Sequence, residues 1–246
     1  MIKVNQLKKS FGKNEVLKGV DLEIDGSGVF AVLGPNGSGK TTIIKSILGM
    51  VLPDSGQILI DNKPIDKQWA YRKHIDYLPQ IARFPENLTV NELIKMVKDI
   101  RGQQGNESRL IELFELEPYL NSRLRNLSGG TRQKVNLVLC FMFDNRLIVL
   151  DEPTVGLDPV AMIRLKQLIK DERSNGKTIM ITTHIMDVVE ELADTIIFLL
   201  EGKIYFKGSL QDMYAITNEV KLERSIASIL EKYTETQKIK TQQADG

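Results

Sequence analysis

The amino-acid sequence predicts an α/β fold with a mainly parallel, covered β-sheet. Short apolar runs, such as residues 29–33 and 147–150, have the length and composition of buried strands. Longer stretches with apolar residues at helical spacing alternate with these runs, an order typical of parallel sheets with helical crossovers. With 246 residues, 42% of them hydrophobic, the chain is long enough for one domain with an inserted subdomain.

The first part of the chain predicts a small antiparallel β layer, followed by a helical insertion. Strands of the layer are expected at residues 1–9, 16–24 and 57–61, with turns at 53–56 and 61–64. A strand at 75–78 then returns the chain to the main sheet. From about residue 84 to 145 the apolar spacing becomes helical, which predicts an inserted α-helical subdomain. Its helices are expected at residues 90–101, 107–116 and 135–143.

The main sheet resumes after this insertion and completes a predicted domain over residues 1–216. Gly176 ends the long helix of this part, because glycine commonly follows the last helical turn. The remaining elements are expected as a strand at 147–150, a helix at 160–175, a strand at 178–182, a helix at 185–193 and a hairpin at 195–208 that turns at Glu201 and Gly202.

Residues 217–246 form a separate C-terminal segment. Leu222, Ile226, Ile229, Leu230 and Tyr233 recur at helical spacing, which predicts an amphipathic helix. Two interpretations of its apolar face stay open: packing on the chain's own domain, or contact with a partner or a second copy. Residues 234–246 are polar and poor in apolar side chains, a composition that favours disorder.

A glycine-rich loop predicts a phosphate-binding site. It reads Gly34, Pro35, Asn36, Gly37, Ser38, Gly39, Lys40, Thr41 and Thr42, which fits the pattern G-x-x-x-x-G-K-[ST] between a strand and a helix. The glycines allow a tight turn whose N–H groups point inward, and the start of the helix adds the positive end of its dipole. Lys40 is expected to reach the β- and γ-phosphates, and the Thr41 hydroxyl to ligate Mg²⁺.

Two acidic residues end the buried strand at 147–150. The carboxyl edge of an open parallel sheet is where ligands bind, so Asp151 and Glu152 are placed to act on the same nucleotide. Neighbouring side chains on a strand point to opposite sides, so the two acids need not share a role. Asp151 fits the Mg²⁺ shell, and Glu152 fits the base that orients or polarises the attacking water.

A second glycine-rich loop has no role in an ordinary nucleotide hydrolase. It reads Leu127, Ser128, Gly129, Gly130, Thr131, Arg132 and Gln133, and is called the signature loop below. Ser128 is a good N-cap, and Gly129 and Gly130 leave backbone N–H groups open at the start of a helix. A plain serine N-cap accounts for the loop within one chain. The other interpretation is that the loop is an anion site, which would close over a nucleotide held by another copy of the chain.

The order of these motifs resembles the ATP-binding subunit of ABC (ATP-binding cassette) systems over about residues 1–215. The resemblance implies a RecA-like P-loop core and further site residues. Phe11 matches the aromatic residue that stacks on adenine, and Gln80 the glutamine that contacts Mg²⁺ and water and senses the transmembrane partner. Asp158 matches the D-loop that crosses the dimer, and His184 the switch histidine at the γ-phosphate. Thr131 replaces a glutamine common in the family and is expected to face away from Ser128, Gly129 and Gly130.

The resemblance also implies partners. Two copies would form a head-to-tail homodimer around two ATP, each site completed by the other copy's Ser128, Gly129 and Gly130. The dimer would drive an integral membrane permease, with a periplasmic or extracytoplasmic accessory protein as a further partner. Residues 81–88 are the candidate docking surface, with Phe84 and Leu88 forming an apolar groove. A loop that simply packs against the helical subdomain accounts for these two residues nearly as well. The expected location is cytoplasmic, peripheral on the inner face of the cell membrane.

Within exporter-type ATPases, the chain looks most similar to the one that helps mature the copper centre of nitrous oxide reductase. The segments that carry this narrower similarity are residues 77–80, 84–87 and 150–159. A soluble ATPase of a cofactor-assembly complex, of the iron–sulfur type, would share every motif above and is the alternative.

Composition and charge argue against other classes of protein. A net charge of +1 gives no electrostatic basis for binding nucleic acid. The N-terminus has no signal-peptide pattern, and no apolar run approaches the ~20 residues that span a bilayer. The single cysteine, Cys140, lies in an apolar helix and is expected to serve packing, and His74 has no companions for a metal site.

Overall fold

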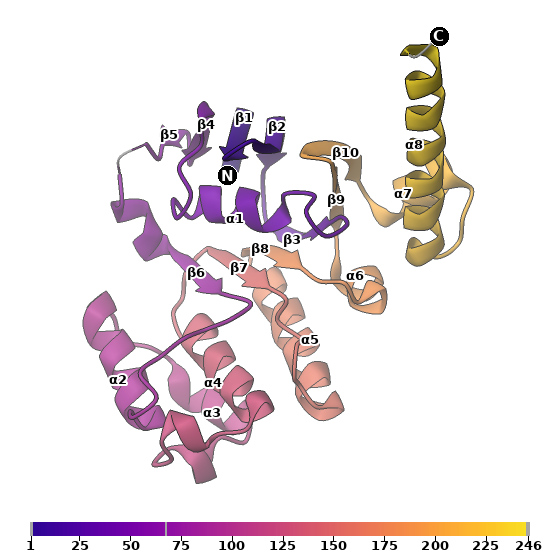
Figure 1. Ribbon diagram of the computed structural model, residues 1–246. Coiled ribbons are helices and arrows are strands. Elements are labelled where there is room, and N and C mark those ends of the chain that lie inside the picture. The colour runs from indigo at the N-terminus through magenta and orange to yellow at the C-terminus, as the bar shows by residue number, and fades with distance from the viewer. Residues whose placement is uncertain (1, 67, 245–246) are drawn as a thin grey trace.

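The fold is built on two β-sheets (Figure 1). The computed structural model describes residues 2–66 and 68–244, with side chains described up to residue 235. The larger sheet has six strands in the order β10-β9-β3-β8-β7-β6. These are β3 (Gly28–Leu33), β6 (Ile75–Leu78), β7 (Leu147–Asp151), β8 (Thr178–Thr182), β9 (Thr195–Leu200) and β10 (Lys203–Gly208). All neighbours are parallel except β10, which forms an antiparallel hairpin with β9.

The smaller sheet is antiparallel and lies over one face of the first. Its order is β2-β1-β4-β5, with β1 (Ile2–Phe11), β2 (Asn14–Ile24), β4 (Ser55–Ile60) and β5 (Lys63–Pro64). Helix α1 (Lys40–Ile47) lies between the two sheets (Figure 1). Its buried residues Ile43, Ile44 and Ile47 share one core with side chains of both sheets. The phosphate loop at the start of α1 is thereby fixed to both layers.

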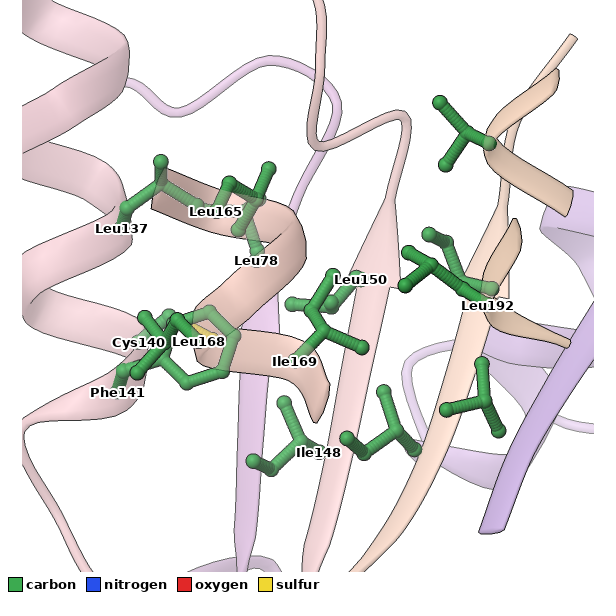
Figure 2. Close-up of a cluster of buried hydrophobic side chains, with 14 of the residues drawn as sticks. Leu78, Leu137, Cys140, Phe141, Ile148, Leu150, Leu165, Leu168, Ile169 and Leu192 are labelled. Atoms are coloured by element: carbon green, nitrogen blue, oxygen red, sulfur yellow. The ribbon is translucent and has the colours of Figure 1, made fainter. Parts of the chain in front are cut away.

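Helices on the opposite side of the larger sheet form the second core together with it. These are α2 (Val90–Arg101), α3 (Glu107–Leu113), α4 (Gly129–Phe141), α5 (Pro159–Ser174) and α6 (Met186–Leu192). Figure 2 shows Leu165 of α5 near Leu137 of α4, and Leu168 of α5 beside Cys140 and Phe141 of α4. Cys140 belongs to this core, and burial raises the pKa of its thiol, which disfavours thiolate chemistry. The α/β fold predicted from the sequence, with its antiparallel layer and mainly parallel sheet, is confirmed.

Helices α2, α3 and α4 lie within residues 84–145, the stretch expected to be a helical subdomain, and are called the helical subdomain below. Helix α2 begins with a capping box, in which Thr89 accepts from the Glu92 N–H and the Glu92 carboxylate accepts from the Thr89 N–H. Helix α4 begins at Gly129, six residues before the expected start at residue 135. The Ser128 side chain caps α4 by accepting from the N–H of Thr131, which offsets the low helix propensity of two glycines.

The C-terminal segment contains two helices, α7 (Leu210–Thr217) and α8 (Leu222–Ala244). The sequence does not anticipate α7. Leu222 and Ile229 of α8 are buried in the second core, and Ile226, Leu230 and Tyr233 pack partly against it. The apolar face of α8 therefore packs on the chain's own domain, the first of the two interpretations above.

Helix α8 continues to Ala244, through a stretch for which the composition favours disorder. Residues 245 and 246, the end of that stretch, lie outside the described residues. Across the part of the chain that the structure describes, helices are either too short or too polar to span a bilayer.

Candidate nucleotide-binding site

A cleft of ≈ 700 Å³ lies at the carboxyl edge of the larger sheet. Strand register explains why it forms there: Thr182 of β8 pairs with both Val32 of β3 and Asp151 of β7. The ends of three parallel strands therefore meet at one point, as expected for ligand sites in open α/β sheets. The cleft collects side chains that are far apart in the sequence, namely Phe11, residues 34 and 36–42, Gln80, Asp151, Glu152 and His184.

The phosphate loop needs glycine at two positions for steric reasons. Gly34 has φ 148°, and a Cβ there would lie 2.2 Å from the Leu199 carbonyl oxygen. Gly39 has φ 107°, and a Cβ there would lie 2.7 Å from a methyl group of Leu17. Positive φ and these close approaches both exclude larger residues.

The loop also presents donors that the protein leaves unpaired. Gly39 caps α1 without a side-chain hydrogen bond, so the first N–H groups of the helix remain open. The Ser38 hydroxyl is buried and has no hydrogen-bond partner among the described residues. An orphaned hydroxyl beside open N–H groups fits the oxygens of a bound phosphate.

Lys40 is folded into the same loop. Its Nζ donates to the carbonyl oxygens of Gly34 (2.6 Å) and Pro35 (3.0 Å). Burial lowers the pKa of Lys40, against the opposing effect of the nearby carboxylates of Glu152 and Asp151. A phosphate would give this partly desolvated ammonium a stronger acceptor than two carbonyls do.

Asp151 is held rigidly at the floor of the cleft. It is 4% exposed, and its Oδ1 accepts from the Thr182 hydroxyl at 2.5 Å. Its carboxylate shares the cleft with the Thr41 hydroxyl and the Gln80 side chain. Carboxylate, hydroxyl and amide oxygens are the hard donors that Mg²⁺ takes, together with phosphate oxygens, so the residues present fit this ion.

Glu152 adopts an unusual backbone conformation beside this floor. Its φ is 51°, in the left-handed region that a side chain with a Cβ seldom occupies. Its N–H donates to the carbonyl oxygen of Thr182 (3.0 Å), which holds the turn. Its Oε2 lies 2.9 Å from Nδ1 of His184, whose side chain is 73% exposed. The strained turn therefore directs Glu152 toward His184 at the mouth of the cleft.

The signature loop lies outside this cleft. Ser128 and Gly129 belong to the N-terminus of α4 in the helical subdomain, and neither lines the cleft. Asp158 is also elsewhere: it caps α5 by accepting from the N–H of Ala161 at 2.8 Å. The structure thus separates the predicted site residues into one group that lines the cleft and a second group, Ser128, Gly129, Gly130 and Asp158, away from it. Pro35 does not line the cleft itself, but its carbonyl oxygen accepts from Lys40.

One expectation about the signature loop is wrong. Thr131 was expected to face away from Ser128, yet its hydroxyl lies 2.8 Å from the Ser128 hydroxyl. The cause is the N-cap geometry, which brings the third residue of a helix back over its capping residue. The side chain at position 131 therefore contacts the hydroxyl of Ser128 directly.

Sequence reasoning also missed residues of the cleft. Thr182 and Thr183 line it, together with Asn14, Val16 and Met186. Thr182 is the most informative, because it holds both Asp151 and Glu152. The available signal was a polar residue at the end of an apolar strand, two positions before His184.

Comparisons with known proteins identify the family. Residues 17–155 match the ABC transporter family. The chain is 35% identical over 210 residues to the lantibiotic transport ATP-binding protein SrtF of Streptococcus pyogenes, covering 83% of this chain and 89% of that protein. It is 34% identical to the Nod factor export ATP-binding protein I of Rhizobium sp. (strain N33), covering 82% of this chain and 69% of that protein.

Comparison with solved structures indicates the same family as these relatives. An ATP-binding subunit of an ABC transporter superposes with a TM-score of 0.87 at 29% identity, covering 94% of this chain and 99% of that chain. The dimeric post-hydrolysis state of the cassette MJ0796, bound to ADP and Pi, superposes with a TM-score of 0.76 at 26% identity, covering 85% and 99%. Together with the phosphate loop and the paired acids in one cleft, these similarities show that the chain belongs to the ABC transporter family, as an ATP-binding cassette that hydrolyses ATP.

Proposed function

We propose that the chain is the ATP-hydrolysing subunit of an exporter, in which two copies enclose two ATP and drive a separate membrane permease. The observation that carries this proposal is the position of the signature loop outside the chain's own cleft. A site with a phosphate loop and catalytic acid but without its signature residues is completed by a second copy. The relatives named as lantibiotic and Nod factor export proteins, and the dimeric state of MJ0796, support this assembly.

Within one cleft, each predicted residue has a role that its environment supports. The open N–H groups of the phosphate loop and Lys40 bind the phosphates, and Phe11, 52% exposed at the rim, stacks on the adenine. Thr41, Gln80 and Asp151 would hold Mg²⁺, which when bound neutralises charge on the phosphates. Asp158, from the second group, belongs to the contact between the two copies.

Hydrolysis requires an oriented water and a place for its proton. Glu152 is the acceptor that orients and polarises this water, because it lies at the mouth of the cleft with only 13% of its side chain exposed. His184 keeps the Glu152 carboxylate in place through the 2.9 Å contact. As the resemblance to the family implies, it would also contact the γ-phosphate. Ser128, Gly129 and Gly130 of the second copy would add N–H donors from the other side.

A second hollow offers a place for the permease. A groove of ≈ 450 Å³ is lined by residues after Gln80 and by the start of α4, including Ile81, Phe84 and Val135. Its rim carries the charged residues Arg83, Glu86 and Arg132. Leu88, expected to share this groove with Phe84, does not line it. Both side chains pack partly against the second core. An apolar floor with a charged rim suits a short helix from a cytoplasmic loop of the permease.

Location, accessory partner and cargo follow from the permease and stay proposals. A cassette docked on such a partner is cytoplasmic and peripheral on the inner face of the membrane, with a periplasmic or extracytoplasmic accessory protein as a further subunit. Maturation of the copper centre of nitrous oxide reductase is one candidate pathway; the relatives above are named for lantibiotic and Nod factor export instead. A soluble cofactor-assembly ATPase is the second candidate function, favoured only by the shared motifs.

The test is purification of a tagged Glu152→Gln chain from detergent-solubilised membranes with ATP and Mg²⁺, followed by mass spectrometry. Loss of the catalytic carboxylate should stall hydrolysis and keep the dimer closed. The purified sample should then contain a polytopic permease. Copper-protein maturation factors in the same sample would support the narrower pathway. Recovery of soluble proteins alone, with the chain absent from membranes, would support the assembly ATPase instead.

The same purification tests whether the permease docks in this groove. Phe84→Asp places a charge on its apolar floor and should reduce permease recovery by more than about tenfold, since burying an unpaired charge costs several kcal/mol. Nucleotide binding should be unchanged, because Phe84 does not line the cleft. The matched control is Ile100→Asp, on an exposed position of α2 away from the groove. Equal recovery with Phe84→Asp and Ile100→Asp would contradict this assignment.

A further inference from the structure

The signature helix α4 and the turn before α5 are joined within one chain. Nζ of Lys134, on the second turn of α4, lies 2.7 Å from Oδ2 of Asp158. The other oxygen of the same carboxylate accepts from the N–H of Ala161 and so caps α5. One carboxylate thus fixes the first turn of α5 and binds the helix that carries the signature loop.

The backbones of the two segments are also in close contact. A Cβ added at Gly130 would lie 2.7 Å from the carbonyl oxygen of Gly156. Gly130 therefore allows α4 to approach the turn at residues 156–158, called the D-loop below, as closely as backbone atoms permit. Contact at Gly130 and the ion pair at Lys134 lie one helical turn apart on α4.

A second ion pair reinforces the same junction. Glu115, just after α3, accepts from Arg164 of α5 at 2.5 Å. Arg164 holds the pKa of Glu115 below its ordinary value, with a smaller contribution from Lys134 and an opposing one from Asp158. The four charges therefore lie near one another, two from the helical subdomain and two from the N-terminal half of α5. Of these four residues, only Lys134 directly follows the signature loop, and only Asp158 belongs to the D-loop.

We propose that Lys134 is a positioning residue that holds the D-loop against the signature helix, so that one copy presents both segments to its partner as a single preformed surface. This inference rests on the proposed function, in which the partner's ATP is closed by these two segments. Preforming the surface removes the conformational cost of ordering two loops separately when the dimer closes.

The burial of the pair separates this role from a general contribution to folding. The Lys134 side chain is 18% exposed, but the Asp158 side chain is 50% exposed and open to solvent. Ion pairs with such exposure contribute little to the free energy of unfolding, since water screens them. Loss of Lys134 should therefore appear in dimer closure rather than in the stability of the single chain.

The experiment measures ATP-driven dimerisation by sedimentation, with all variants in a Glu152→Gln parent that retains ATP. Lys134→Met should raise the dimer dissociation constant about tenfold, because both copies lose their pair at the contact. Lys134→Arg keeps the charge and should restore dimerisation to within about threefold of the parent. ATP binding to the single chain should be the same in all variants.

The matched control is Lys98→Met. Lys98 forms a similar ion pair with Glu107 (2.6 Å, side chain 23% exposed) within the helical subdomain, away from both loops. Its loss should leave dimerisation unchanged. If Lys98→Met weakens the dimer as much as Lys134→Met, general loosening of the subdomain explains the effect and the inference is overturned.

Two further outcomes have distinct meanings. If the parent dimerises with ATP and Lys134→Met dimerises equally tightly, the inference about Lys134 is overturned, while the proposed function stands. A parent that stays monomeric at saturating ATP would overturn the shared-site function and, with it, the inference.

Discussion

Asp76 places a carboxylate inside the main sheet, where strands of this kind are usually apolar throughout. It lies on β6, four residues before Gln80, and is 0% exposed. Its Oδ1 accepts from Arg101 (2.7 Å) and from Asn145 (2.8 Å), whereas its Oδ2 has no partner among the described residues. Arg101 ends α2 and also lies over the ring of Phe143. Asp76 therefore connects the helical subdomain to the strand that leads to Gln80.

Asp76 should make the stability of the protein depend on pH. Burial raises its pKa above the ordinary 3.8, an effect that Asn145, Arg101 and Lys177 reduce but do not cancel. The unfolded chain therefore ionises first, and folding stability falls as the pH rises from about 3.8 through the raised pKa. Asp76→Asn keeps an acceptor and removes the ionisation, so the variant should gain stability relative to wild type across this window.

Urea unfolding of both proteins from pH 4 to 7 measures that difference. The expected result is a difference in unfolding free energy that moves in favour of Asp76→Asn as the pH rises. A difference that stays constant over the whole range would show that this carboxylate is not the source of the pH dependence.

At the scale of elements, one carboxylate joins three helices. Oε1 of Glu190, on α6, accepts from the hydroxyl of Tyr214 on α7 (2.8 Å) and from the N–H of Leu222 at the start of α8 (2.7 Å). Burial, and then Glu190, raises the pKa of Tyr214 to about 12, so its hydroxyl remains a donor. Because α6 begins two residues after His184, this contact also fixes the element that follows His184.

Removing that acceptor should loosen the C-terminal helices. Glu190→Ala leaves both donors without a partner and should lower the free energy of unfolding by about 1–3 kcal/mol, while Glu190→Gln keeps an acceptor and should lose less. Denaturant unfolding checks both values, with Glu231→Ala on the exposed side of α8 as control. Equal losses for Glu190→Ala and Glu231→Ala would mean that the contact does not hold α7 and α8.

The sequence located the elements that have strong local patterns. The bounds of β6, α2 and β8 were predicted to the residue, because each has a clear apolar period and a polar boundary. Helix α7 was missed because only Met213 and Thr217 of its eight residues are buried, too few to show a period. The early start of α4 was missed because paired glycines disfavour a helix that the Ser128 cap and tertiary packing nevertheless form.

The site was predicted in the same uneven way. Residues that follow strand ends, such as Asp151 and Glu152, reach the cleft because sheet topology brings those ends together. The pair of Lys134 with Asp158 has no local signal, since it depends on how the helical subdomain sits against α5. Sequence patterns thus encoded what each segment does, and packing decided which segments touch.

At the scale of the whole molecule, the nucleotide machinery is divided between two bodies. The cleft belongs to the sheets and α1, and the signature loop belongs to the helical subdomain. Ion pairs join that subdomain to the rest of the chain at β6 through Arg101 and at α5 through Lys134 and Glu115. In a head-to-tail dimer, each copy would therefore give its partner a loop whose position its own core controls.

This division predicts that a charge at Ser128 will act only on the dimer. Ser128→Asp keeps the N-cap of α4 but places a negative charge where the partner's phosphates would lie, which costs several kcal/mol. ATPase activity should fall by more than about 100-fold, while ATP binding to the single chain should be unchanged. Ser128→Asn also caps the helix, is nearly the same size and carries no charge, so it should retain at least about tenfold more activity than the aspartate variant.

The pair of variants separates the two accounts of the signature loop. If Ser128 merely caps α4, aspartate and asparagine are equivalent, since both cap helices well and the Ser128 side chain lies outside its own cleft. Equal ATPase rates for the two variants would therefore contradict a shared site. A large difference in rate, with equal ATP binding by single chains, requires that the charge meets a nucleotide belonging to another copy.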